Sequence, residues 1–292
     1  MQASDIAWQP FTPGGVAAFA RARHLHLLIV QLITALVSAG TVLWFLSSAW
    51  FPVIDSAVHQ LPPAGEIRSG RLAWPGEPAV MLAENHFLAL SVDLQHAGQA
   101  RSPAHVQLEF GRADLRMFSL LGMAQASYPA GWTVAFSREE LVPWWGAWAP
   151  MLLAIAGVGL VFCLFAGWFL VATLYCPVAW LAGFFADRDL SLRAAWRLAS
   201  AALIPGALFL DAAVVLYGLG ALDVVRLLFA VVAHFAIGWV YLLISPFCCL
   251  PHPALAAKGS PFARPDPGSA GGPGSVSVAR PDDKTNLDVR SN

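Results

Sequence analysis

The sequence predicts an α-helical polytopic membrane protein of about four spans, with a small extracytoplasmic β-rich domain and a disordered C-terminal tail. The first observation is a run of 46 residues, 141–186, that contains no charged side chain. A helix needs about 20 apolar residues to cross the ~30 Å hydrocarbon core of a bilayer. The second is the composition, 58% hydrophobic and 12% charged, because soluble domains carry about 25% charged residues. The third is that most of the charge before the tail gathers in one stretch, 52–146.

The net charge and the cysteines exclude several classes of protein. A net charge of −1 does not provide the basic surface that nucleic acid binding requires, so no nucleic acid partner is expected. The four cysteines lie in or beside apolar segments and none falls in 52–146, so no disulfide is expected there. Cys248 and Cys249 are adjacent, whereas zinc ligands are spaced along the chain, so no metal site is expected.

The segment 1–26 is expected on the cytoplasmic side and 27–51 as the first span. Thr12-Pro13 is typical of a helix start, which leaves two interpretations, a short helix on the membrane surface or a frayed tail. The apolar run is longer than the roughly 7–15 residues of a signal-peptide core, so it is interpreted as a retained anchor. Trp44 and Trp50 suit its far interface with water.

The stretch 52–146 is expected to form the β-rich domain. Its apolar patterning predicts strands at Phe87–Leu94, Val106–Phe110 and Trp132–Phe136. Ser69-Gly70 predicts a turn between two more short strands. At roughly 80–90 residues, the domain is near the lower size limit for an independent core.

The segment 147–250 is interpreted as a three-span membrane domain with a cytoplasmic loop near 187–197. The spans are expected near 148–172, 198–219 and 224–245. Pro177 interrupts the charge-free run, so residues 148–186 hold either one span with a bent extension or two tight spans. The remaining 251–292 is rich in Pro, Gly, Ser and charge, and is expected to be a disordered cytoplasmic tail.

Two local patterns predict contacts of the helix that contains the second span. Ser137 and Glu140 match a capping box, which places the start of the helix there. Gly159, Cys163 and Gly167 are spaced four apart, and small residues at this spacing predict the close approach of another helix.

The arginines predict the orientation in the membrane. Four spans put Arg21 and Arg23, the 187–197 loop and the tail with Lys258 and Arg264 on one side. The positive-inside rule makes that side cytoplasmic, so both termini are expected inside the plasma (inner) membrane and 52–146 outside. Five spans would move the loop or the N-terminus across, and four are therefore favoured.

Three ionisable residues in the third and fourth spans are the candidate functional residues. Asp211 lies about 12 Å from the outer end of its span, while Arg226 and His234 lie about 6 and 18 Å from that end of the next span, at about 1.5 Å per residue. A carboxylate there costs roughly 2.5–3.5 kcal/mol and is expected to face protein. The favoured interpretation is a hydrogen bond or ion pair between the two helices, and the alternative is a proton or ion relay.

The expected function is non-enzymatic, an accessory or sensing role in which the outer domain contacts a partner, an envelope component or a ligand. The chain holds no nucleophile elbow, phosphate loop, HExxH or dinucleotide fingerprint, so no catalytic residues and no cofactor are expected. His59, His86, His96 and His105 match no zinc spacing. The expected partners are the bilayer and a membrane or envelope protein, with the oligomeric state left open.

The alternative function is a small transporter or transport subunit that uses Asp211 and His234. Transporters usually show repeated halves with interrupted helices, and this sequence shows no such symmetry. The four tryptophans near the second span are interpreted as an interface belt rather than a ligand site. They are Trp132, Trp144, Trp145 and Trp148.

Two segments resemble an uncharacterised bacterial membrane family, some members of which are labelled maltodextrin-utilisation proteins. Leu61-Pro62 with Glu66–Leu72 (EIRSGRL) resembles its opening strand and turn, and Leu190–Ala199 (LSLRAAWRLA) with Ile204–Leu208 (IPGAL) resembles its helix entry and proline. The resemblance covers about residues 10–250 and implies one span, an extracytoplasmic β-domain and a cluster of C-terminal spans. It implies no catalytic residues. The chain departs from the family at Ile204, where the family has threonine, and in its tail.

Overall fold

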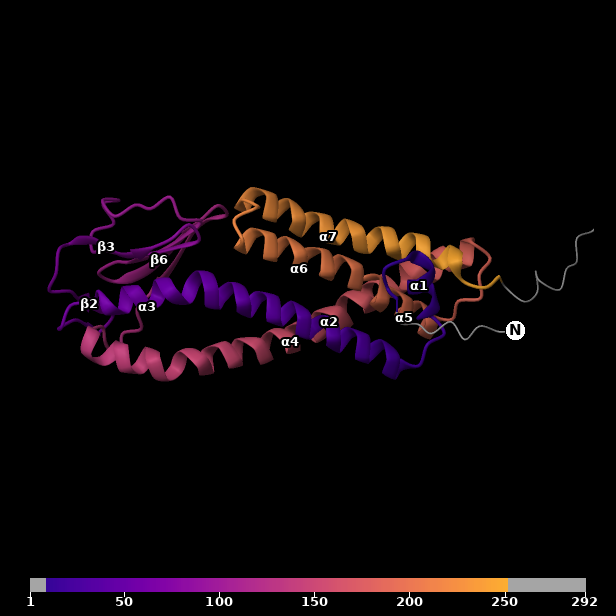
Figure 1. The fold of residues 1–292 in the computed structure, drawn as a ribbon, viewed down its shortest axis with the longest axis horizontal. Helices are drawn as coiled ribbons and strands as arrows, with labels where there is room; N and C mark the ends of the chain where they lie inside the picture. The colour runs from indigo at the N-terminus through magenta and orange to yellow at the C-terminus, as the bar shows by residue number, and fades with distance from the viewer. Residues whose placement is uncertain (1–8, 252–292) are drawn as a thin grey trace, which may run out of the picture. The chain divides into compact units, whose positions relative to one another are not determined.

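The computed structural model describes residues 9–251, which combine a helical part and a β-rich part (Figure 1). The predicted tail, with Lys258 and Arg264, lies outside the described residues apart from its first position. The helices are α1 (Pro13–Ala18), α2 (His24–Phe45), α3 (Phe51–His59), α4 (Arg138–Phe185), α5 (Leu192–Ala202), α6 (Ile204–Gly218) and α7 (Val224–Ile244).

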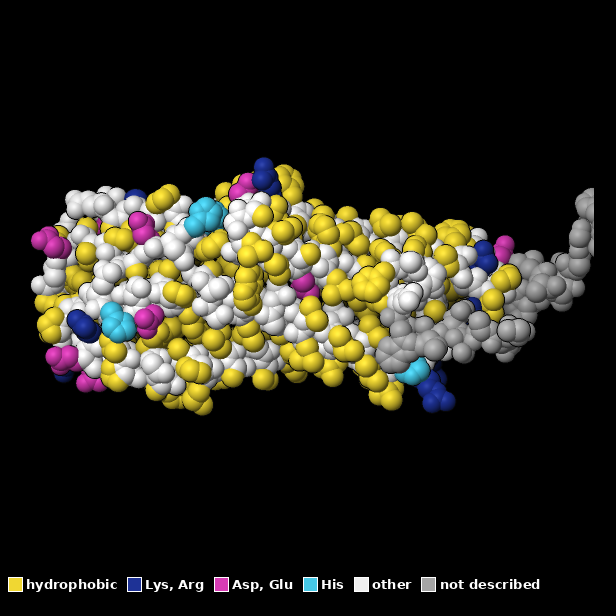
Figure 2. Space-filling model, viewed as in Figure 1, with side chains coloured by type: hydrophobic (Ala, Val, Ile, Leu, Met, Phe, Trp, Pro, Cys, Tyr) yellow, Lys and Arg dark blue, Asp and Glu magenta, His cyan; other side chains and the backbone are white. Residues whose placement is uncertain are grey.

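Within residues 9–251, four helical stretches are long and apolar enough to cross a membrane, a number that matches the predicted one of about four. They are His24–His59, Arg138–Phe185, Leu192–Gly218 and Val224–Cys248. Figure 2 shows hydrophobic side chains over most of the helical part in this view, with charged side chains mainly toward its ends. On α4, Val158 and Phe162 are each 74% exposed, as expected for side chains that face lipid.

The charge-free run forms part of one continuous helix, so the structure favours one span over two tight ones. α4 has 48 residues and contains Pro143, Pro150 and Pro177. At about 1.5 Å per residue it is about 72 Å long, more than twice the ~30 Å of a hydrocarbon core. A π-helical turn at Leu46–Trp50 joins α2 to α3, giving a second helix of 36 residues. Both helices are therefore long enough to extend well beyond a bilayer core.

The predicted third span consists of two helices. α5 ends at Ala202 and α6 begins at Ile204, immediately before Pro205. Proline lacks the N–H that would continue the backbone ladder, which explains the break at Leu203. Gly206 lies where α7 approaches most closely, because a Cβ there would be 2.5 Å from the carbonyl oxygen of His234.

The helical core includes the short N-terminal helix. Thr12 caps α1 by accepting a hydrogen bond from the Gly15 N–H at 3.0 Å. Val16 and Phe19 are fully buried, in the same cluster as Leu198 and Leu242. The predicted helix start is thus confirmed, and the frayed tail is excluded for this segment.

Two sheets make up the β-rich part, a three-stranded antiparallel sheet and a five-stranded mixed sheet. One has the strand order β2-β1-β8 and the other β3-β4-β5-β6-β7, in which only β4 and β5 run parallel among the described strands. The strands are β1 (Glu66–Arg68), β2 (Arg71–Ala73), β3 (Ala79–Glu84), β4 (Leu88–Asp93), β5 (Val106–Phe110), β6 (Asp114–Ser119), β7 (Gly122–Ser127) and β8 (Thr133–Ala135). α3 packs against β3 and β4, and its Val53 and Ala57 share a core with Leu88 and Val92.

The three predicted strands and the Ser69-Gly70 turn are confirmed, whereas β3, β6 and β7 were not predicted. Ser69 and Gly70 have φ values of 50° and 73°, as a tight hairpin turn requires. β7 is exposed along its whole length, so it has no buried face to produce an alternating pattern.

The helix start predicted at Ser137 is confirmed, because α4 begins at Arg138, but the predicted capping box and the predicted close approach at Gly159 are wrong. Ser137 is the N-cap residue of α4, but its side chain makes no capping hydrogen bond; its carbonyl accepts from Leu141 instead. Gly159 has nothing within 4 Å of an added Cβ, and the close approach occurs at Gly157, where a Cβ would lie 2.8 Å from Leu43 Cδ1.

Candidate functional site

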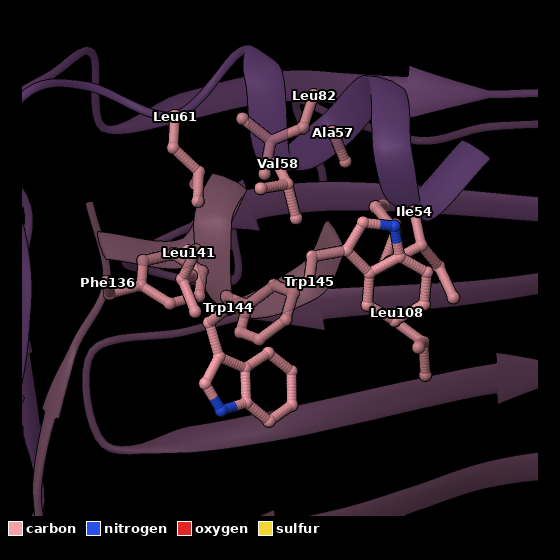
Figure 3. Close-up of a pocket in the computed structure, with 12 residues that line it drawn as sticks. Ile54, Ala57, Val58, Leu61, Leu82, Leu108, Phe136, Leu141, Trp144 and Trp145 are labelled. Atoms are coloured by element: carbon pink, nitrogen blue, oxygen red, sulfur yellow. The ribbon is translucent and has the colours of Figure 1, made fainter. Parts of the chain in front are cut away.

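An apolar cavity lies where α3 and the first turns of α4 meet the five-stranded sheet (Figure 3). It encloses about 270 Å³, and all twelve lining side chains are aliphatic or aromatic. They are Ile54, Ala57, Val58, Leu61, Leu82, Leu90, Leu108, Phe110, Phe136, Leu141, Trp144 and Trp145.

Helical and strand periodicities bring these side chains to one place. Ile54, Ala57, Val58 and Leu61 are three or four residues apart on one face of α3 and the turn that follows it. On the sheet, Leu108 and Phe110 alternate along β5 and so share a face. Leu90 pairs with Leu108 in the register between β4 and β5, which extends that face across the strands.

The first two turns of α4 supply the remaining wall. Leu141, Trp144 and Trp145 follow the same helical spacing. Figure 3 shows the Trp145 ring lying beside Ile54 of α3, and Trp145 also packs on Phe51 with ring centroids 5.0 Å apart. Trp144 is 48% exposed, so it stands at the open side of the cavity.

Two of the predicted belt tryptophans are therefore cavity residues. Trp144 and Trp145 line the cavity, whereas Trp132 is 63% exposed and Trp148 is 42% exposed. Helical spacing from Leu141 was the available signal. The prediction missed it because the opposing walls come from α3 and the sheet, which are distant in the sequence.

The size and lining of the cavity define what it can bind. Small-molecule sites usually occupy roughly 300–1,000 Å³ and combine an apolar lining with a few polar groups that orient the ligand. At about 270 Å³, the cavity is close to the lower end of that range. Its aliphatic and aromatic lining suits a hydrocarbon chain or ring, not a metal ion or a charged substrate.

A second cluster, the His96 cluster, consists of His96, Glu109 and Asp114 in the β-rich part. His96 Nδ1 lies 2.6 Å from Glu109 Oε1, and its Nε2 lies 2.7 Å from Asp114 Oδ1. Glu109 is fully buried. The two ring nitrogens of His96 thus bridge a carboxylate of β5 and a carboxylate of β6.

Its neighbours hold the Asp114 carboxyl ionised. Burial opposes ionisation, but the hydrogen bond and charge of His96, together with Arg116, outweigh burial and hold the pKa of Asp114 below its usual value. Gln125 also donates to Asp114 Oδ2, at 2.5 Å. The cluster thus ties β5, β6 and β7 to the segment that follows β4.

The His96 cluster is a tightly packed hydrogen-bonded network. Within residues 9–251, no group of three or more His, Cys, Asp or Glu side chains is arranged to hold a metal ion. His96 has a φ of 53°, and a Cβ at Gly111 would lie 2.2 Å from its Nε2, so the ring fits only because residue 111 is glycine. No local pattern in the sequence predicts this network, because residues 13 and 18 positions away complete it.

A third cluster joins the β-rich part to α6. His105 Nδ1 lies 2.6 Å from Tyr217 Oη, and the His105 ring is 4.2 Å from the His86 ring between centroids. Phe45 and Phe87 pack on Tyr217 at 5.4 and 5.0 Å. Burial and, secondarily, the charge of His86 lower the pKa of His105, while Asp223 acts in the opposite direction.

The structure does not bring the three predicted intramembrane residues together. Ser38 of α2 donates a hydrogen bond to Asp211 Oδ2 at 2.8 Å. His234 Nδ1 contacts the carbonyl of Val231 in its own helix. Arg226 pairs with Asp223, with Nε and Oδ2 3.5 Å apart and both side chains exposed.

The predicted pairing of Asp211 with the fourth span is therefore corrected. α6 packs against both α2 and α7, and Gly206 is the residue that approaches α7 closely. Asp211 instead faces α2. The prediction considered only the next helix in the chain, because a short turn makes it an obvious neighbour.

Comparison of the chain with protein-family models, curated proteins and solved structures finds no match. The resemblance to the family with maltodextrin-utilisation members accordingly stays a prediction.

Proposed function

We propose that the chain is a non-enzymatic, multi-pass protein of the plasma (inner) membrane, with an accessory or sensing role. In this account the β-rich part is outside the cytoplasm and binds the hydrocarbon portion of an amphipathic ligand in the apolar cavity. The observation that carries the proposal is the composition of the cavity walls, which are aliphatic and aromatic throughout. Such a lining suits binding and not acid-base or nucleophilic chemistry.

The connection of the cavity to the spans supports a sensing role. Its helical walls are α3 and the first turns of α4. α3 continues into α2, and α2 and α4 pack on each other. A ligand that enters between α3 and α4 changes their separation, and that change is transmitted along two helices that reach the opposite end of the bundle.

The arginines support the orientation. Arg197 Nη2 donates to the carbonyl of Ala20 at 2.5 Å, and Arg188 Nη1 donates to that of Cys249 at 2.9 Å. These hydrogen bonds bring the N-terminal segment, the loop before α5 and the end of the last predicted span together at one end of the helical part. Basic residues next to spans favour the cytoplasmic side, which leaves the β-rich part outside.

The alternative of a small transporter using Asp211 and His234 has less support. Asp211 bonds to Ser38 and His234 to its own helix, so the two side chains do not form a relay. An interhelical hydrogen bond from Ser38 is a scaffolding contact. We accordingly retain a membrane or envelope protein and the bilayer as the expected partners.

The test is photocrosslinking of the full chain, reconstituted in nanodiscs, with a fatty acid that carries a diazirine at its chain end. We expect saturable crosslinks to peptides of α3 and the first turns of α4, displaced by unmodified oleate. Ala57→Leu, which fills the cavity, is expected to reduce those crosslinks at least about fivefold. Ala113→Leu, at an exposed loop position, is the matched control.

A second variant covers the case in which Ala57→Leu does not fold. Leu108→Ala enlarges the cavity and is expected to retain the crosslinks. Crosslinks spread evenly along the lipid-facing helices, with no displacement by oleate and no effect of Ala57→Leu, would exclude the cavity as a ligand site.

A further inference from the structure

The turn between β6 and β7 is apolar and exposed. Ser119 pairs with Gly122, so Leu120 and Leu121 form a two-residue loop. Leu120 is 54% exposed and Leu121 is 84% exposed. Hairpin turns usually carry Gly, Asn or Asp, and here only Gly122, with a φ of 121°, follows that preference. Two leucines at this tip, called the β6–β7 tip below, need an explanation beyond turn formation.

The tip lies beside the outer end of the α6–α7 pair. Leu120 and Val224, the first residue of α7, line the same hollow. Leu219 and Val225, on either side of the α6–α7 turn, are 67% and 46% exposed. Figure 1 shows the sheet that contains β6 reaching toward this turn. The exposed apolar surface of the tip therefore continues onto the ends of two helices that are apolar enough to cross a membrane.

The charge next to the tip is positive. The Arg101 guanidinium stacks over the Phe118 ring at 4.0 Å from its centroid, and Arg101 is exposed in the hollow shared with Leu120. Arg226 is also exposed, and Asp223 partly neutralises it. An apolar tip beside an exposed arginine matches the boundary between acyl chains and phosphate headgroups, where arginine stems extend toward the phosphates.

We propose that the β6–β7 tip inserts Leu120 and Leu121 into the headgroup boundary of the same bilayer that the helices cross, with Arg101 facing lipid phosphate. The proposal depends on the membrane placement given under the proposed function and not on the cavity ligand. The tip then gives the β-rich part a second attachment to the membrane, distant in sequence from α3 and α4.

The experiment uses the full chain with its four cysteines replaced by alanine. One cysteine is introduced at Leu121→Cys or, as the matched control, at Ala113→Cys, which is exposed at the other end of β6. Each is labelled with an environment-sensitive fluorophore and reconstituted in nanodiscs of phosphatidylcholine and phosphatidylglycerol. Lipids that carry a nitroxide near the headgroup report proximity to the bilayer, and iodide reports exposure to water.

At position 121 we expect at least about twofold quenching by the nitroxide lipid and protection from iodide. At position 113 we expect the reverse. Quenching by iodide with no effect of the nitroxide at position 121 would overturn the proposal, as would equal nitroxide quenching at both positions. Protection from iodide without nitroxide quenching would also overturn it and would indicate that protein covers the tip. None of these outcomes depends on whether the cavity binds a fatty acid.

Discussion

His105 Nδ1 and Tyr217 Oη lie 2.6 Å apart, and this hydrogen bond connects the β-rich part to α6. The two rings also stack, with centroids 5.5 Å apart and planes inclined by 22°. Phe45 of α2 and Phe87 surround the same phenol. The junction is thus a packed aromatic cluster with a polar contact inside it, not a flexible linker between two independent parts.

Tyr217→Phe removes the hydrogen bond and retains the ring packing. A typical intramolecular hydrogen bond contributes about 1 kcal/mol, so we expect the free energy of unfolding to fall by about that amount. Thermal unfolding in detergent, followed by tryptophan fluorescence, measures the change. Tyr175→Phe removes a hydroxyl from α4 and serves as the control. An equal loss of stability in both variants would show that the His105 contact is not responsible.

The same junction predicts a pH dependence. The folded-state pKa of His105 is lowered from its ordinary value of 6.5, so the folded state favours the neutral ring. Stability from this group is fully present above the unfolded value and is lost as the pH falls through the folded pKa. We expect the unfolding temperature to fall on acidification below about 6.5, with a smaller fall in His105→Gln. Identical pH profiles for the two proteins would contradict this assignment.

Removing the His96 side chain tests how much the His96 cluster contributes to the free energy of unfolding. Without the imidazole, Glu109 and Asp114 each lose a buried partner, and breaking a buried pair costs about 3–5 kcal/mol. His96→Ala is therefore expected to lower the free energy of unfolding by that amount. His59→Ala is the control, since His59 and Asp55 are 47% and 56% exposed at 3.7 Å and such pairs contribute about 0–1 kcal/mol. Similar effects of the two substitutions would refute the role of the His96 cluster.

The helical pattern of the chain was predictable from local sequence. The charge-free run at 141–186 predicted the helix that became α4, and its three prolines did not interrupt it. Pro205 lies within the predicted third span, and α6 begins immediately before it. These features depend on composition and backbone chemistry within one element, so a single sequence carries them.

The sites were not predictable, because each joins residues far apart in the chain. Ser38 and Asp211 are separated by 173 positions and His105 and Tyr217 by 112. Their pairing depends on which helix faces α6 and on how the sheet packs against it. The cavity likewise forms only where the register of β4 with β5 and one face of α3 bring apolar side chains together. Neither feature predicts the cavity alone.

The hydrogen bond between Ser38 and Asp211 predicts that two conservative substitutions differ in their effect on stability. Asp211→Asn retains an acceptor for the Ser38 hydroxyl and is expected to leave unfolding nearly unchanged. Ser38→Ala removes the donor and is expected to cost about 0.6 kcal/mol, the average for side-chain hydrogen bonds between membrane helices. Chemical unfolding in mixed micelles measures both. A larger loss for Asp211→Asn than for Ser38→Ala would instead favour a charged role for Asp211.

The side of the membrane on which the β-rich part lies is decisive for the proposed topology. Gln95→Cys and Arg193→Cys, both at exposed positions, are placed singly in the cysteine-free background and treated in intact cells with a membrane-impermeant maleimide. If the β-rich part lies outside, we expect labelling of position 95 in intact cells and of position 193 only after permeabilisation. Labelling of position 193 in intact cells with position 95 protected would contradict this topology.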